Sequence, residues 1–362
     1  MTPDAASSRV GVTAGEFRVD ESGNATYRVP ILTAPGSGGM APRISLNYSS
    51  KAGNGPMGMG WSLGGISAIT RCSRTIEQDG KSGRRGVTLT ANDRFCMDGQ
   101  RLIAVSGTYG ATGAEYRSEV DTISKIVSSG MAGTGPQSFT VWRKDGSVIQ
   151  YGATADSRIE ARTASDSQTV FTWAQNRVTD AAGNYIDYVY TEFTSAGGEP
   201  VEFLLASVLY TGNAGAATVP YAQIDFIYDS NRTDSTVGAT GGAQFAQSRL
   251  LKRIDSRSRV SAGSSLTSLR SYHLTYQAGG DGYGRAALSA ITECNDSNKT
   301  YCFPPTALDW QRSKHQVSNS SVTIGSVFNS KHAGLAMADI NGDGRPDLLL
   351  SEKSGNAFVF RT

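Results

Sequence analysis

The sequence lacks an excess of charge of either sign. Its 34 Lys and Arg residues are balanced by 32 Asp and Glu residues, which leaves a formal net charge of +2 over 362 residues. Binding to the phosphates of nucleic acid requires clustered positive charge, so the composition argues against a nucleic-acid-binding protein. With 38% hydrophobic residues, the chain can nevertheless bury a sizeable core, which excludes a disordered chain.

Long hydrophobic runs are also missing. The longest apolar stretch, residues 203–210, is interrupted by Ser207 and is far shorter than the roughly 18 residues that a membrane-spanning helix needs. The first residues, MTPDAASSRVGV, have neither the positive segment nor the apolar segment of a signal peptide. We expect no membrane span, and either export by another route or a start at Met1 that marks a cut in a longer chain.

Cysteine and histidine are scarce, with four Cys and three His that match no zinc-binding spacing. Cys294 and Cys302 bracket a polar turn, CNDSNKTYC, whereas Cys72 and Cys96 end two segments, ITRC and DRFC, with strand character. Two disulfides, one within each pair, would be compatible with an oxidising compartment. Four buried free thiols remain the alternative, because cysteine also behaves as a small hydrophobic residue.

What the sequence does have is glycine, 42 residues of it, and short segments in which polar and apolar residues alternate. This period of two is typical of β-strands with one buried face. The clearest examples are residues 43–49, 139–151 around Asp145-Gly146, 169–190 around Asp180-Ala-Ala-Gly183, 221–228 and 269–276. Helical patterning is rare, and residues 242–253 are its best candidate. The sequence therefore predicts an all-β fold built on a large multi-stranded antiparallel sheet, shell-like or sandwich-like.

A cation-binding pattern lies near the C-terminus in Asp339-Ile-Asn-Gly-Asp-Gly-Arg-Pro-Asp347. Oxygen side chains at loop positions 1, 3, 5 and 9 can converge on one hard cation, and Gly344 permits the sharp turn. An EF-hand would need Glu at position 12, where this chain has Leu350. The three carboxylates would repel one another without a cation, although an Asx-rich turn without metal is the alternative.

Apolar segments flank this loop, Leu335-Ala-Met-Ala before it and Leu348-Leu-Leu-Ser after it. Strand, calcium loop and strand together resemble an FG-GAP (VCBS-type) repeat, in which each repeat is one blade of a β-propeller. The resemblance implies bound calcium, with the following ligands: Asp339, Asn341, Asp343 and Asp347 by side chain, and Arg345 by its backbone carbonyl. One blade cannot close a propeller, so we expect a truncated propeller and an N-terminal piece of a longer polypeptide.

Two glycine-rich segments match enzyme motifs. Gly53-Asn-Gly-Pro-Met-Gly58 fits the dinucleotide-binding fingerprint, but that chemistry needs a helix N-terminus, and the following segment has the turn and strand character of β-structure. Gly60-Trp-Ser-Leu-Gly64 fits the nucleophile elbow of a hydrolase, which needs a buried parallel strand before Ser62 and a helix after it. Neither requirement is met by the pattern, so a Ser62-based hydrolase is only the third hypothesis.

Segments in a fixed order over most of residues 15–311 resemble the N-terminal domain of the Salmonella virulence plasmid B protein (SpvB-type) family. They include Gly15-Glu-Phe-Arg-Val, Pro42-Arg-Ile-Ser-Leu-Asn-Tyr48, Gly58-Met-Gly-Trp-Ser-Leu-Gly64, Asp93-Arg-Phe-Cys-Met-Asp-Gly-Gln-Arg-Leu102 and Ser289-Ala-Ile-Thr-Glu-Cys294. An SpvB-type domain followed by FG-GAP repeats resembles the start of Tc-toxin B components and RHS polymorphic toxins. Residues 180–190, DAAGNYIDYVY, also resemble a single tyrosine-rich YD repeat of the RHS type.

The resemblance implies a tail at 1–14, an SpvB-like domain at 15–311 and one FG-GAP repeat at 331–362. The clearest change of composition, RSKHQVSNSSVTIGSVFNS at residues 312–330, predicts a linker between the two domains. The resemblance also implies a non-catalytic structural and delivery module of a secreted toxin complex. Its partners would be the RHS/YD shell, an effector domain and a pore-forming component, with no nucleic acid. The transferase activity of some family members is not carried over, because this chain has no Glu-x-Glu. An extracellular adhesin, or a glycan- or protein-binding module, is the alternative.

Overall fold

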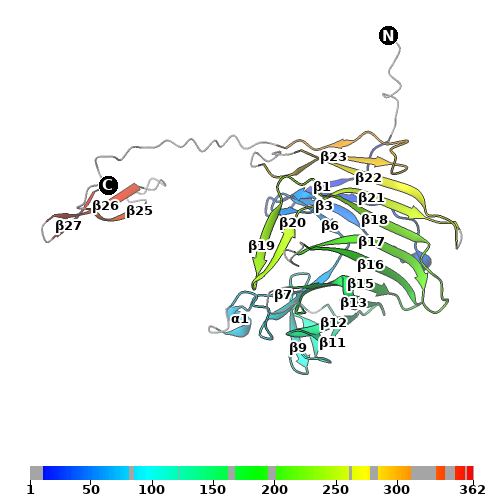
Figure 1. Cartoon of the computed structure of the whole chain (residues 1–362), viewed down its shortest axis with the longest axis horizontal. Helices are drawn as coiled ribbons and strands as arrows, with labels where there is room; N and C mark the ends of the chain where they lie inside the picture. Colours follow the sequence, from blue (N-terminus) through cyan, green and yellow to red (C-terminus); the bar gives the residue numbers. More distant parts are fainter. Residues whose placement is uncertain are drawn as a thin grey trace, which may run out of the picture. The chain divides into compact units, whose positions relative to one another are not determined.

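The computed structural model describes residues 11–80, 85–120, 122–161, 168–194, 201–260, 263–277 and 284–310, and the backbone of three strands between 332 and 361. The chain divides into two compact units, Met1–Arg312 and Ser313–Thr362. Regular structure in both is almost entirely β-strand (Figure 1), which confirms the predicted all-β class. Within the described residues, no helix is long and apolar enough to cross a membrane.

A small closed barrel of eight antiparallel strands forms one part of the first unit (Figure 1). Neighbouring strands pair in sequence order from β7 to β13, and β15 closes the barrel by pairing with both β13 and β7. The predicted Asp145-Gly146 hairpin lies between β12 and β13, with Gly146 at φ 79°. The strands are β7 (Ala68–Cys72), β8 (Arg94–Met97), β9 (Gln100–Ser106), β10 (Glu115–Ser118), β11 (Lys125–Ala132), β12 (Gly135–Trp142), β13 (Val148–Tyr151) and β15 (Val170–Thr179).

Aromatic rings fill the barrel. Phe95, Phe139 and Trp173 pack edge to face in all three pairs, with ring centroids 5.1 to 5.4 Å apart. Such edge-to-face pairs add stability beyond the area that they bury. The indole Nε1 of Trp173 donates a hydrogen bond to the Pro136 carbonyl at 3.0 Å, so the ring's polar atom is satisfied inside the core.

A large antiparallel sheet begins where β15 leaves the barrel. The predicted turn at residues 180–183 joins β15 to β16, with Gly183 at φ 84°. The sheet then continues through β17, β18, β21, β22 and β23 to β24. These strands are β16 (Asn184–Thr194), β17 (Val201–Asn213), β18 (Ala222–Asp229), β21 (Leu250–Ser258), β22 (Thr267–Gln277), β23 (Ala287–Cys294) and β24 (Thr306–Ala307).

A second, four-stranded sheet covers one face of this large sheet. Its strands are β1 (Glu16–Val19), β2 (Ala25–Pro30), β3 (Ser45–Ser49) and β6 (Trp61–Gly64), in that order. Val29 and Leu46 of the small sheet share one buried cluster with Ile224 and Ile254 of the large sheet. The two sheets therefore form a sandwich, which agrees with the predicted sandwich-like architecture.

The predicted helix at residues 242–253 is wrong. The segment forms strand β20 (Ala243–Gln247), which pairs with β19 (Thr236–Thr240), and then the start of β21. Leu250, Leu251 and Ile254 are all buried in the sheet, so burial in the sheet overrides the local pattern. The helices among the described residues are short: α1 (Ile76–Asp79), η2 (Ser37–Gly39) and η4 (Ala155–Ser157), which leads into β14 (Arg158–Glu160).

The second unit contains an antiparallel three-stranded sheet. Its strands are β25 (His332–Ala338), β26 (Asp347–Ser354) and β27 (Ala357–Arg361). The strands predicted on either side of the calcium loop are therefore present. Asp339, Asn341, Asp343 and Arg345 lie outside the described residues, and Asp347 is described only as the first backbone position of β26. The FG-GAP repeat, its calcium and the domain boundaries remain predictions.

Candidate functional site

A disulfide-closed loop at the end of β23 forms one wall of a pocket. Cys294 ends β23, and a disulfide joins it to Cys302 across the predicted polar turn. Inside the loop, the Asp296 carboxylate accepts backbone hydrogen bonds from residues 298 and 300, each at 3.0 Å. The side-chain oxygen of Asn295 accepts another from the Tyr301 backbone N–H at 3.0 Å. These bonds, together with the disulfide, fix the shape of the loop.

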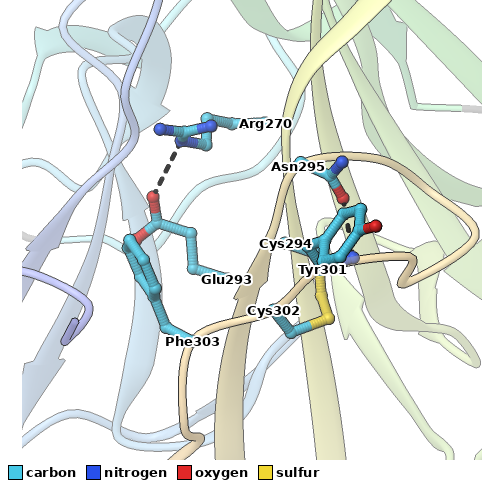
Figure 2. Close-up of a pocket in the computed structure, with 7 residues that line it drawn as sticks. All are labelled: Arg270, Glu293, Cys294, Asn295, Tyr301, Cys302 and Phe303. Carbon is cyan, nitrogen blue, oxygen red and sulfur yellow. Dashed lines mark hydrogen bonds and ion pairs between the residues drawn. A yellow bond between two sulfur atoms is a disulfide. The ribbon is translucent and has the colours of Figure 1, made fainter. Parts of the chain in front are cut away.

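The pocket beside this loop has a volume of about 320 Å³. Figure 2 shows Arg270, Glu293 and Phe303 on one side and the disulfide, with Asn295 and Tyr301, on the other. A neighbouring cavity of about 580 Å³ shares Arg270, Glu293 and Phe303. The two cavities therefore meet at the Arg270–Glu293 pair, which β22 and β23 bring together.

Arg270 and Glu293 form an ion pair inside the pocket. Arg270 Nε lies 3.3 Å from Glu293 Oε1, and the glutamate side chain is 10% exposed. Burial raises the pKa of Glu293, and the nearby guanidinium only partly opposes this shift. A carboxyl next to a guanidinium offers both hydrogen-bond acceptors and hydrogen-bond donors to polar groups of a ligand or partner.

A buried Ser–His–Asp cluster lies next to this site. Ser271 Oγ is 2.6 Å from Asp255 Oδ1 and 3.1 Å from His273 Nε2. Burial, aided by the charge of Lys299, lowers the pKa of His273. In a catalytic triad the aspartate bonds to the histidine and the serine hydroxyl faces the substrate. Here the aspartate bonds to the serine, and Ser271 is 0% exposed, so the cluster is a structural network.

Ser62, the nucleophile of the hydrolase hypothesis, lies within strand β6, opposite Asn47 of β3. The chain continues into β7 rather than a helix, so the strand–turn–helix geometry of an elbow is not formed. Ser62 borders a cavity of about 400 Å³ that also contains Asp98 and Tyr190 but no described histidine. His273, the only histidine whose side chain is described, bonds to Ser271 instead.

The Gly53–Gly58 motif, which fits the dinucleotide-binding fingerprint, forms a β-hairpin in the structure. Strands β4 (Asn54–Gly55) and β5 (Gly58–Met59) pair directly, and the element that follows them is strand β6 rather than a helix. Gly58 has φ +76°, and a Cβ there would lie 2.5 Å from the Ala286 carbonyl oxygen. The glycine is therefore required for the close approach of two backbones.

Both proposed cysteine pairs are bonded in the structure. Cys72 and Cys96 join the paired strands β7 and β8, and Cys294 and Cys302 close the loop described above. In the described part of the chain, no group of three or more His, Cys, Asp and Glu side chains is suited to a metal. Most of the predicted calcium loop lies outside the described residues, so this finding does not test it. The Arg270–Glu293 pair was not found from the sequence, because no local pattern links residues on two separate strands.

Comparisons with solved structures show the same fold. The crystal structure of TcdB2–TccC3 matches with a TM-score of 0.70 and 18% identity, over 98% of this chain and 19% of that chain. The structure of the Photorhabdus luminescens Tc holotoxin pore matches with a TM-score of 0.67 and 17% identity, over 97% of this chain and 18% of that chain. The N-terminal domain of the effector SpvB from Salmonella typhimurium strain LT2 matches with a TM-score of 0.56 and 19% identity, over 74% of this chain and 100% of that chain.

This chain spans about a fifth of the length of the Tc-toxin chains. No curated protein matches its sequence. The family model described as Salmonella virulence plasmid 65kDa B protein (SpvB) matches residues 19–203, just over half of the chain, and this chain therefore belongs to the SpvB family.

Proposed function

We propose that this chain is a non-catalytic structural module of a secreted bacterial toxin complex. In this proposal its sheets form part of a protein wall that houses or docks a separate toxic polypeptide. The observation that carries the proposal is the match to TcdB2–TccC3 over 98% of this chain, together with membership of the SpvB family. Partners would be an RHS/YD shell, an effector domain and a pore-forming component.

The chemistry of the exposed sheet supports a structural role. Charges on neighbouring strands neutralise one another, as in Arg177 with Asp187 at 2.5 Å and Lys252 with Asp229 at 3.3 Å. The near-neutral total charge suits contact with other protein surfaces better than contact with phosphates. The same sheet would then extend into the neighbouring parts of the assembly.

The proposal is tested on the full polypeptide that contains this chain, expressed with a YD-repeat protein encoded beside it. We expect one stable complex in which a cargo domain resists trypsin, and loss of that protection when residues 15–311 are deleted. An unchanged protection pattern after deletion would contradict the proposal. Binding of this chain alone to host cells would favour the adhesin, and esterase turnover lost in Ser62→Ala would favour the hydrolase.

Calcium binding by the second unit is part of the same proposal. Asp339, Asn341, Asp343 and Asp347, with the Arg345 carbonyl, would supply the oxygen ligands. Because calcium would bind only the folded state, it should raise the melting temperature of this unit, and a chelator should reverse the rise. The response should disappear in Asp343→Ala. A calcium-dependent shift of the same size in that variant would eliminate this ligand set.

A further inference from the structure

Four aromatic side chains form a row across the small sheet. Trp61 of β6 lies opposite Tyr48 of β3, Tyr48 opposite Tyr27 of β2, and Tyr27 opposite Phe17 of β1. Trp61 lies 5.5 Å from Tyr48 and 6.3 Å from Tyr27, measured between ring centroids. The exposed fraction rises from 3% at Trp61 to 64% at Phe17. The row therefore begins in the core and ends in solvent.

Strand β1, which carries Phe17, is an edge of the sheet. Among the described residues it pairs only with β2, and all four of its residues are exposed. Val19, on the same face as Phe17, is 61% exposed. A sheet edge has backbone N–H and C=O groups free to pair with another strand, and exposed apolar side chains make such pairing more favourable.

The charges of β1 indicate which strand would fit. Glu16 and Arg18 flank Phe17 and form an ion pair with each other, with side chains 52% and 74% exposed. If a second copy of β1 lies antiparallel with Phe17 at the centre, Glu16 of each copy faces Arg18 of the other. Opposite charges in directly opposed positions stabilise an antiparallel pair.

Other antiparallel registers are less favourable. Centring the pair on Arg18 would place two arginines opposite each other and would bring Glu16 opposite Asp20, both like-charge contacts. A slip by one residue would place Phe17 opposite Arg18, which mixes the aromatic face with the charged face. The sequence Glu-Phe-Arg therefore favours one self-complementary register.

We propose that β1 is a homodimerisation edge, in which two copies of this chain join their small sheets through antiparallel β1 strands centred on Phe17. The two Phe17 rings then lie side by side, and the aromatic rows of both copies form one continuous row. A closed twofold interface of this kind uses the same surface on each copy. Because β1 has four residues, the dimer is weak and depends on protein concentration.

The test is sedimentation analysis of this chain over a concentration series, with two charge variants. Glu16→Arg and Arg18→Glu each place like charges opposite one another in the homodimer, so each should weaken dimerisation by about tenfold. An equimolar mixture of the two variants restores both opposite-charge pairs and should dimerise as well as the wild type. Glu21→Arg, which changes an exposed residue in the turn after β1, is the matched control and should dimerise normally.

Each result decides the proposal. A wild-type chain that stays monomeric at the highest concentration overturns it, as does a dimer that both single variants preserve. Failure of the mixture to regain dimerisation also overturns the Phe17-centred register. Circular dichroism and melting curves of the variants should match the wild type, because both side chains are exposed. The proposal does not depend on the toxin-complex function, since the isolated chain suffices for the test.

Discussion

The closed barrel and the sandwich use the same strand, β15, but are stabilised differently. The barrel has a complete circle of strand pairs and a core of aromatic rings around Trp173. Among the described residues the sandwich has open edges, such as β1. Tyrosine hydroxyls bond to backbone carbonyls in both regions: beside the barrel core, Tyr109 Oη donates to the Leu102 carbonyl at 3.2 Å, and two tyrosines do the same in the sandwich. Tyr210 Oη donates to the Ala34 carbonyl at 3.1 Å, and Tyr276 Oη donates to the Leu251 carbonyl at 2.6 Å.

Buried ion pairs occur in both regions. In the barrel, Arg71 and Asp93 pair at 3.2 Å with side chains 0% and 3% exposed, and Arg71 Nε donates to the Val170 carbonyl. Outside the barrel, Arg232 and Asp234 pair at 2.9 Å with side chains 0% and 8% exposed, whereas the Arg270–Glu293 pair of the sandwich lines a pocket. The two regions therefore differ less in buried charge than in closure: the barrel strands form a complete circle, whereas the small sheet of the sandwich has a described edge at β1.

The largest expected effect is loss of the central barrel ring. Trp173→Ala removes two edge-to-face contacts and one hydrogen bond and should lower the free energy of unfolding by about 3–5 kcal/mol. Urea unfolding followed by circular dichroism measures this change. Trp142→Ala, at a ring 41% exposed, is the control and should change it by less than about 1 kcal/mol. Equal losses of unfolding free energy in the two variants would show that the aromatic core of the barrel contributes no more to stability than an exposed ring.

The strands were predicted from the sequence more successfully than their assembly. Alternation and the Asp145-Gly146 and 180–183 turns predicted β12, β13, β15 and β16, because these signals are local. Closure of the barrel depends on Trp173 pairing opposite Ile69, about a hundred positions earlier in the chain. No local pattern encodes such a contact, so the barrel could not be predicted.

The candidate site shows the same limit. The cysteine spacing suggested the Cys294–Cys302 loop, since both ends lie within one short turn. Arg270 and Glu293 meet only because β22 and β23 pair in one register, with Tyr272 opposite Glu293. The helix predicted at residues 242–253 was wrong for a related reason, because burial in the sheet determines the conformation there and the local pattern does not.

The two disulfides offer a direct comparison of the two regions. The barrel bond, Cys72–Cys96, spans 24 residues, and the sandwich bond, Cys294–Cys302, spans 8. A disulfide restricts the unfolded chain, and more so when it closes a longer loop. Changing both cysteines to alanine should therefore lower the free energy of unfolding by about 3.5 kcal/mol for the barrel bond and by about 2.5 kcal/mol for the sandwich bond. Urea unfolding under non-reducing conditions measures both losses. A larger loss for the sandwich pair would reverse the predicted order, and four free thiols in the denatured wild type would refute both bonds.

The smallest expected effect is an opposite response of the two regions to pH. Burial raises the pKa of Glu293 in the sandwich, so its contribution to stability is present below its unfolded value near 4.5 and is lost as the pH rises through the folded value. Asp79, the last residue of α1, pairs with Arg94 and Arg101 of the barrel strands β8 and β9, and burial opposes its ionisation. Hydrogen bonds from Arg101, Thr75 and Arg94 outweigh that effect and lower its pKa. Its contribution is therefore present above 3.8 and is lost as the pH falls.

Two substitutions separate these responses. Glu293→Gln should remove part of the stability loss that the wild type shows as the pH rises from about 4 to about 7. Asp79→Asn should instead reduce the loss seen as the pH falls below about 4. The urea midpoint at each pH is the measurement. If both substitutions altered stability only on the acidic side, or only on the side of rising pH, the opposite pH responses assigned to Glu293 and Asp79 would be wrong. The pocket would then not hold a carboxylate that burial destabilises.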